Sequence, residues 1–154
     1  MNQTKSTNRS NKSIKQTKVL SDLEIKFNTV MIGMINYISE YYETSHFAEI
    51  KEVAESFSSQ KPEEPIAYFL YHIYRNDDYR INILKENDDF FMGKFKELDD
   101  NFSSDDNNII SAKYMVKLFE FKELWAEMDM MSKLYVKRSM KALVQISQKY
   151  ISLL

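Results

Sequence analysis

Glycine and proline, the residues that most often interrupt helices, are almost absent from this chain. Gly33, Gly93, Pro62 and Pro65 are the only examples among 154 residues, and residues 109–154 contain neither type. Apolar side chains recur at spacings of three and four, the period of a helix with one buried face. Strand-like alternation is missing over any useful length. We therefore predict an all-α fold, a compact bundle of five to seven helices.

The same scarcity excludes several classes of protein. Two glycines cannot build a Gly-rich phosphate loop or a dinucleotide fingerprint. Without cysteine there is no disulfide scaffold, no cysteine-ligated zinc and no thiol nucleophile, and nothing in the composition favours secretion. No segment approaches the roughly 18 apolar residues that span a bilayer, and no signal-peptide core is present. We expect an intracellular protein of the cytoplasm, nucleus or virion, without membrane contact.

The first 18 residues differ from the rest of the chain. They carry five basic residues and no acid, whereas residues 19–154 carry 16 basic and 23 acidic residues. Their few apolar side chains cannot offset the roughly 1–2 kcal/mol per residue that ordering the backbone costs. We predict a disordered basic tail over residues 1–18 and a single helical domain over residues 19–154.

This tail is the main candidate for binding. Its bases recur every three or four residues, so a helix induced by binding would align them toward phosphates or another acidic partner. The alternative is a solvated arm or an assembly tether. The residues concerned are Lys5, Arg9, Lys12, Lys15 and Lys18.

Local signals predict where helices begin and end. Ser21 and Glu24 have the spacing of a capping box, which predicts a helix start. Pro65 fits the first turn of a helix over 66–74, and this segment is apolar on every face, which predicts a central position in the bundle. A break near 129–132 is expected, because one unbroken helix over residues 109–154 would be too long for a compact domain.

Two acidic pairs allow two interpretations. Asp77 with Asp78, and Asp88 with Asp89, would make a metal-binding or acid–base site if the intervening turn brought them together. Positions at helix starts explain them more simply, with Asn87 as a cap and the acids near the positive end of the helix dipole. We predict no enzyme, no catalytic residue, no metal site and no cofactor.

The histidines and one polar loop support the same view. His46 and His72 lie in no metal-binding motif, and His72 is interpreted as a hydrogen-bonded core imidazole rather than a catalytic base. Residues 99–107 place oxygen donors at alternate positions, as a calcium loop does. Ser104 and Ile110 stand where that loop needs glycine and glutamate, so we interpret it as a solvated connector.

Several short motifs follow one another between residues 25 and 150. A helical segment precedes an Asp-Phe-Phe element, a Leu-Trp pair follows, and an apolar run closes the chain. The residues are Phe69, Asp88, Asp89, Phe90, Phe91, Leu124, Trp125, Met140, Leu143 and Ile146. In this order they resemble poorly characterised all-helical proteins of nucleocytoplasmic large DNA viruses. The resemblance implies a helical fold and brings no catalytic residues.

Together these observations predict a non-enzymatic viral interaction or structural module. The bundle is expected to dock on a protein partner or on further copies of itself, through aromatic or methionine side chains that remain exposed. The alternative is a nucleic-acid-associated protein that binds phosphates through its tail. A contiguous exposed apolar patch on the folded body would favour the first hypothesis.

Overall fold

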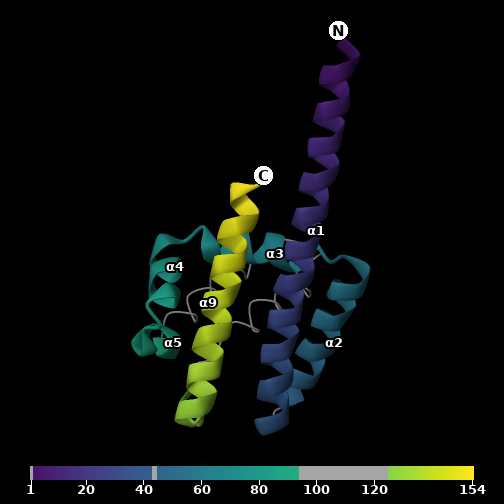
Figure 1. The fold of residues 1–154 in the computed structure, drawn as a ribbon. Helices are drawn as coiled ribbons and strands as arrows, with labels where there is room; N and C mark the ends of the chain where they lie inside the picture. Colours follow the sequence, from purple (N-terminus) through teal and green to yellow (C-terminus); the bar gives the residue numbers. More distant parts are fainter. Residues whose placement is uncertain (1, 43–44, 94–124) are drawn as a thin grey trace, which may run out of the picture.

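Two long antiparallel helices form the axis of the molecule. The computed structural model describes residues 2–42, 45–93 and 125–154, and every regular element within these ranges is helical. Helix α1 spans Asn2–Tyr41, and α9 spans Met130–Ser152. Helix α9 packs antiparallel against the part of α1 that lies within the bundle (Figure 1). The prediction of an all-α bundle is confirmed.

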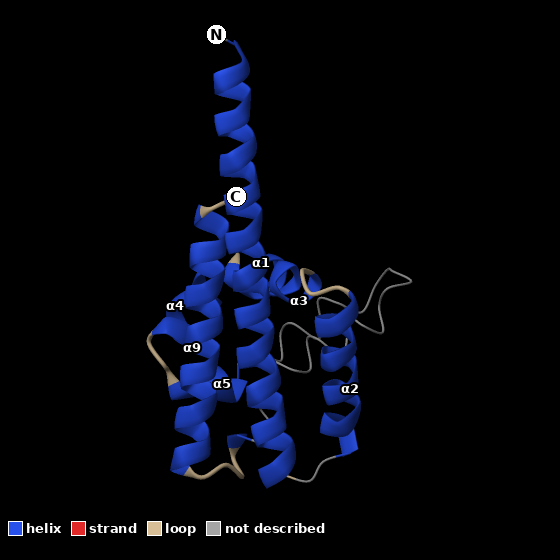
Figure 2. Cartoon of the chain, turned by 45° about the vertical axis from the view of Figure 1, so that its right-hand side comes forward, coloured by secondary structure: helices blue, strands red, loops and turns tan. Residues whose placement is uncertain are grey.

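The middle of the chain supplies shorter helices around this pair. Helix α2 (Ser45–Gln60) packs against α1, and α3 (Glu64–Phe69) contacts both of them (Figure 2). The chain then continues as a π-helix, η1 (Leu70–Tyr74), and as α4 (Asp77–Leu84), which packs against α9. Helix α5 (Asp88–Gly93) follows α4.

Apolar side chains from these helices meet in one core. On α1 the buried positions repeat at three- and four-residue spacing, as the sequence pattern predicts. Phe27 meets Phe69 of α3 edge to face, with ring centroids 5.3 Å apart. Phe91 of α5 stacks on Trp125 at 5.3 Å and an interplanar angle of 14°. Fully buried residues include Phe27, Met31, Met34, Ile35, Ile38, Ala54, Ile66, Phe69, Ile83, Phe91, Trp125, Val136, Met140, Leu143 and Val144.

The N-terminal part of the chain is helical and continuous with the body. Helix α1 runs through Ser21 and Glu24 without interruption, so the predicted helix start there is wrong. No glycine or proline precedes these residues to stop the helix from extending toward the N-terminus. The N-terminal part of α1 projects beyond the other helices (Figures 1 and 2). A helix without packing partners is only marginally stable in water, in keeping with a basic tail outside the core.

The apolar segment 66–74 is only partly inside the bundle. Ile66 and Phe69 are fully buried, but Tyr71 is 63% exposed and Tyr74 is half-buried. The predicted central position is therefore wrong for one side of this segment. Tyrosine permits this, because the ring packs on apolar neighbours while its hydroxyl reaches water.

Two predicted helix starts are confirmed. Helix α5 begins at Asp88, and the Asn87 side chain accepts a hydrogen bond from the Asp89 amide at 3.2 Å. The expected break near 129–132 is the start of α9, where Asp129 accepts a hydrogen bond from the Ser132 amide at 2.7 Å. The helix expected before this break and the polar loop over 99–107 lie outside the described residues.

Candidate functional site

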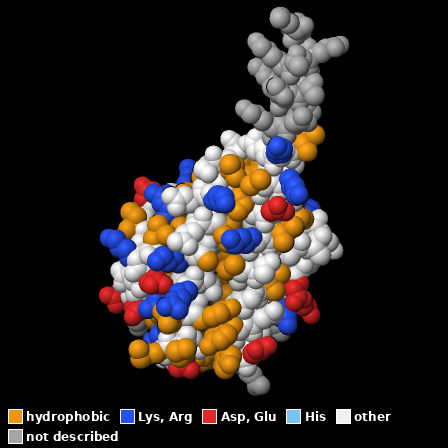
Figure 3. All heavy atoms as spheres, in the orientation of Figure 1, with side chains coloured by type: hydrophobic (Ala, Val, Ile, Leu, Met, Phe, Trp, Pro, Cys, Tyr) orange, Lys and Arg blue, Asp and Glu red, His pale blue; other side chains and the backbone are white. Residues whose placement is uncertain are grey.

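A surface groove lies between α1 and α9. Its volume is about 530 Å³, and its lining is largely apolar. We call it the α1–α9 groove. Its lining residues are Thr29, Val30, Gly33 and Tyr37 from α1, and Met131, Leu134, Tyr135, Arg138, Ser139 and Ala142 from α9. Figure 3 shows hydrophobic side chains gathered over the lower part of this face, near the C-terminal end of α1 and the N-terminal end of α9.

The groove follows from the helical periods of both helices and their antiparallel register. Successive lining residues on each helix are mostly three or four apart, so they occupy one side of that helix. Gln16 donates a hydrogen bond to the Leu153 carbonyl, and the hydroxyls of Tyr37 and Ser132 are 3.1 Å apart. These two contacts are separated by 21 residues on each helix, so the two lining stripes run alongside one another. Gly33 contributes no side chain, which helps to leave the space between them hollow.

Aromatic rings form one wall of the groove. Tyr37 stacks on Tyr135, with ring centroids 4.3 Å apart, and also lies against Tyr41 at 4.7 Å. Tyr41 is 65% exposed, and Met131, on the α9 side, is 71% exposed. Large apolar side chains thus face solvent together at this end of the bundle. We call Tyr37, Tyr41 and Tyr135 the tyrosine stack.

Tyrosine, methionine and arginine side chains line this surface. Tyrosine, methionine and arginine are enriched at the energetic centres of protein interfaces. The groove lining contains no acid and no histidine, so it lacks the usual side chains of acid–base catalysis. Within the described ranges, no three His, Asp or Glu side chains come together to hold a metal ion.

Helix α9, which forms one side of the groove, is positively charged. Helix α9 carries five basic residues and no acid, although the body as a whole is acidic. Lys137 pairs with Asp88 at 2.8 Å, and the Lys133 ammonium lies 5.4 Å from the centre of the Trp125 ring. Arg138, Lys141 and Lys149 form no ion pair with any described residue. The net negative charge of residues 19–154 hides this basic helix, whereas the charge of residues 130–152 alone reveals it.

The predicted tail residues lie on the N-terminal part of α1. Lys15 and Lys18 are exposed there. The structure describes the helix at Lys5, Arg9 and Lys12 but not the side chains of these residues. The described tail bases therefore belong to the helix that forms one side of the groove, and not to a separate element.

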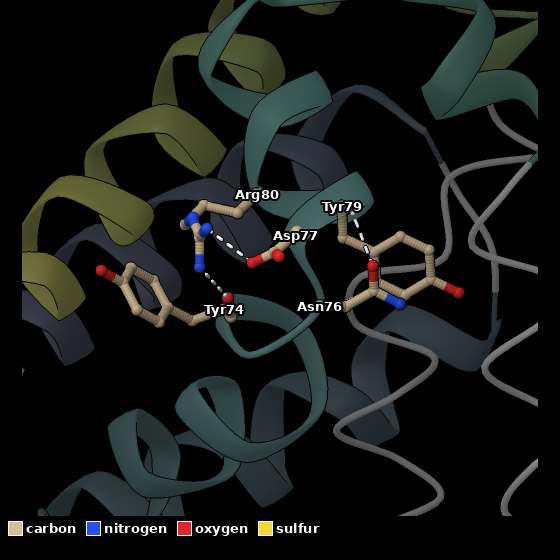
Figure 4. Close-up of polar contacts among 5 residues, drawn as sticks. All are labelled: Tyr74, Asn76, Asp77, Tyr79 and Arg80. Carbon is tan, nitrogen blue, oxygen red and sulfur yellow. Dashed lines mark hydrogen bonds and ion pairs between the residues drawn. The ribbon is translucent and has the colours of Figure 1, made fainter.

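The two acidic pairs occupy helix starts, as the simpler interpretation predicts. Asp77 binds Arg80 at 2.6 Å, and Arg80 also donates a hydrogen bond to the Tyr74 carbonyl at 3.1 Å (Figure 4). In the same view, Asn76 caps α4 by accepting a hydrogen bond from the Tyr79 amide at 3.2 Å. Asp88 is bound by Lys137 from α9. These acidic side chains are exposed and fix helix ends and helix contacts.

His72 packs among aromatic rings on η1. Its ring centroid lies 4.1 Å from that of Tyr68 and 4.6 Å from that of Tyr71. Burial lowers the pKa of His72 to about 4, and burial also raises the pKa of Tyr68 above its ordinary range. The imidazole is therefore neutral near pH 7. It is half-buried, so its predicted position within the core is only partly correct.

None of the described helices combines the length and apolar character that crossing a bilayer requires. No protein-family model matches the chain, and no similar protein is found among curated proteins or solved structures.

Proposed function

We propose that the protein is a non-enzymatic interaction module that holds an amphipathic helix of a protein partner in the α1–α9 groove. The observation that carries this proposal is the exposed tyrosine stack beside Met131. Burying apolar surface stabilises association by roughly 25 cal/mol per Å² before the costs of ordering and desolvation are subtracted. As part of this proposal, the protein is a viral one, as the resemblance of its motifs implies.

A helix fits this groove better than an extended strand. Two adjacent helices present parallel rows of side chains, into which a third helix packs by inserting its own side chains at spacings of three and four. The hollow beside Gly33 is large enough for several such anchors. An added strand would need unpaired backbone groups along a sheet edge, and none exists among the described residues.

The tyrosine stack is held in place before any partner arrives. The Tyr37 ring lies between those of Tyr41 and Tyr135, and its hydroxyl is hydrogen-bonded to Ser132. Side chains that are already ordered lose little conformational entropy on binding. Met131 supplies an adaptable contact next to this rigid surface, because its unbranched side chain adjusts to irregular neighbours.

Affinity purification from the native source, with three forms of the full-length chain, tests the proposal. Wild type is compared with Met131→Glu in the groove and with Ile81→Glu on α4, a matched control at an exposed apolar site. We expect one partner to be retained by wild type and Ile81→Glu and to be lost from Met131→Glu. Equal retention by all three forms would place the partner elsewhere and contradict the proposal.

The second candidate is nucleic-acid binding through the tail. It is favoured by the acid-free sequence of residues 1–18 and by the exposure of Lys15 and Lys18 on a projecting helix. Five phosphate contacts on duplex DNA would give a log–log salt slope of about −4 to −5. Deleting residues 1–18 is then expected to abolish binding. Salt-independent binding would exclude this candidate.

A further inference from the structure

We infer that the helix held in the groove is acidic along the half that lies beside Lys26, Arg138 and Lys149. This inference rests on the proposed docking function and adds the charge of the partner. Its basis is the separation of charge within the chain and the antiparallel register of α1 and α9.

The charge of the chain is strongly segregated. Helices α1 and α9 together hold 11 of the 21 basic residues and only three of the 23 acidic residues. Residues 42–129 hold the other ten bases and 20 acids. Five of the six bases of α1 lie within residues 2–18, and residues 19–41 hold Lys26 and three acids, so the positive charge beside the groove comes mainly from α9.

The cations continue the line of the groove toward the tail. On α9, Met131, Arg138 and Lys149 are separated by seven and eleven residues, close to whole numbers of helical turns. On α1, Tyr37 and Lys26 are eleven residues apart, so they too share one side of their helix. The 21-residue register places Lys149 level with the stretch of α1 between Lys18 and Lys26.

Helix α9 contributes no acid to this line. Asp22 and Glu24 are the two acids on the same stretch of α1. Burial, followed by the nearby Glu63 carboxylate, raises the pKa of Glu24. Burial, followed by Glu24, raises the pKa of Tyr150, so Glu24 lies near Tyr150 of α9. Figure 3 shows Lys and Arg side chains spread over α1 and α9 above the apolar end of the groove.

A helix laid along the whole groove must match both ends. Its apolar anchors would cover the tyrosine stack and Met131, and its next turns would lie beside Lys26, Arg138 and Lys149. Glutamate or aspartate in those turns is attracted to the cations, whereas lysine or arginine is repelled. The observations favour such a helix over nucleic acid, because a phosphate backbone would leave the exposed apolar side chains at the other end uncovered.

Two synthetic peptides and the full-length protein test the inference. Both peptides have 21 residues with leucine at three- and four-residue spacing and alanine or glutamine elsewhere. One carries four glutamates in one half, and the other carries four lysines at the same positions. Fluorescence anisotropy at low salt is expected to show about tenfold tighter binding of the glutamate peptide, because like charges are excluded from the groove.

Charge-reversal variants locate the effect. Arg138→Glu and Lys149→Glu are each expected to weaken the glutamate peptide by about three- to tenfold. Lys61→Glu, an exposed residue after α2, makes the same change of net charge away from the groove and is expected to leave binding unchanged. Equal weakening by Lys61→Glu would show a net-charge effect and overturn the inference.

The remaining outcomes separate this inference from the docking proposal. If both peptides bind equally and Met131→Glu abolishes the binding of both, docking in the groove is supported and the inference of an acidic partner helix is overturned. If neither peptide binds, the docking proposal itself is contradicted. If single-stranded dT20 binds more tightly than the glutamate peptide and loses affinity in Arg138→Glu and Lys149→Glu, the cations serve nucleic acid and the inference is overturned.

Discussion

Tyr37 of α1 and Tyr135 of α9 stack with their ring centroids 4.3 Å apart and an interplanar angle of 21°. The same Tyr37 is hydrogen-bonded through its hydroxyl to Ser132, one turn before Tyr135. These contacts join the two helices that form the groove. The groove therefore depends on residues that also stabilise the fold.

Removing the Tyr37 hydroxyl tests the stabilising role of this contact. Tyr37→Phe keeps the stack but leaves buried Ser132 without this partner, which is expected to lower the free energy of unfolding by about 0.5–1.5 kcal/mol. Urea unfolding followed by circular dichroism measures the change. Tyr135→Phe is the matched control and is expected to leave stability unchanged. Equal losses in both variants would show that the Tyr37–Ser132 contact is not the cause.

Gly33 is expected to be replaceable by alanine. A Cβ atom at this position would lie 3.6 Å from the Tyr135 hydroxyl, an ordinary van der Waals distance. Glycine inside a helix is about 1 kcal/mol less favourable than alanine. Gly33→Ala should therefore raise the melting temperature by about 2–4 °C. A lower melting temperature would show that α1 and α9 need the bare backbone at this point.

Phe91 is expected to be essential for the core near α5. Its side chain is fully buried and stacks on Trp125, the only tryptophan in the chain. Phe91→Ala should cost about 3–5 kcal/mol and shift Trp125 fluorescence to the red as water reaches the ring. Tyr71→Ala, at an exposed site, should change stability by less than about 0.5 kcal/mol. An unshifted spectrum in Phe91→Ala would contradict the observed stack.

His72 makes stability depend on pH. Its pKa is about 4 in the folded chain and 6.5 as an ordinary side chain, because burial disfavours the charged form. The unfolded chain therefore binds a proton at His72 more readily than the folded chain does. The stability that the neutral imidazole contributes to the folded chain is fully present above pH 6.5 and is lost as the pH falls toward 4. Between pH 6.5 and 5, wild type should lose more unfolding free energy than His72→Phe. The prediction is contradicted if the free energies of unfolding of wild type and His72→Phe fall in parallel over this pH range. It is also contradicted if NMR shows that His72 in the folded chain titrates near pH 6.5.

Most of the helices could be predicted from the sequence. The spacing of Phe27, Met31 and Met34 indicates the buried side of α1, and Asp129 marks the start of α9, because both signals are local. The start of α1 could not be predicted from Ser21 and Glu24. A capping box stabilises a helix end only where the chain stops being helical, and nothing in the preceding sequence requires that.

The candidate site was much harder to predict. The tyrosines of the stack have helical spacing, which is equally typical of core residues. Tyr37 and Tyr135 are 98 residues apart, and only the packing of α1 on α9 brings them together and leaves Tyr41 exposed. The position of Met128, Met130 and Met131 near Trp125 favours packing for all three, and this prediction is wrong for Met130 and Met131, which are 87% and 71% exposed. The contiguous apolar patch that would favour a docking module is present between the two helices.

Photo-crosslinking tests the docking surface most directly. The photoreactive amino acid p-benzoylphenylalanine is placed at position 41 at the edge of the groove, or at position 71 on η1, and both native tyrosines are similarly exposed. After irradiation in the native source, we expect a discrete crosslinked protein partner from position 41 and none from position 71. The same crosslinked partner from both positions, or from position 71 alone, would show that the groove between α1 and α9 is not the docking surface.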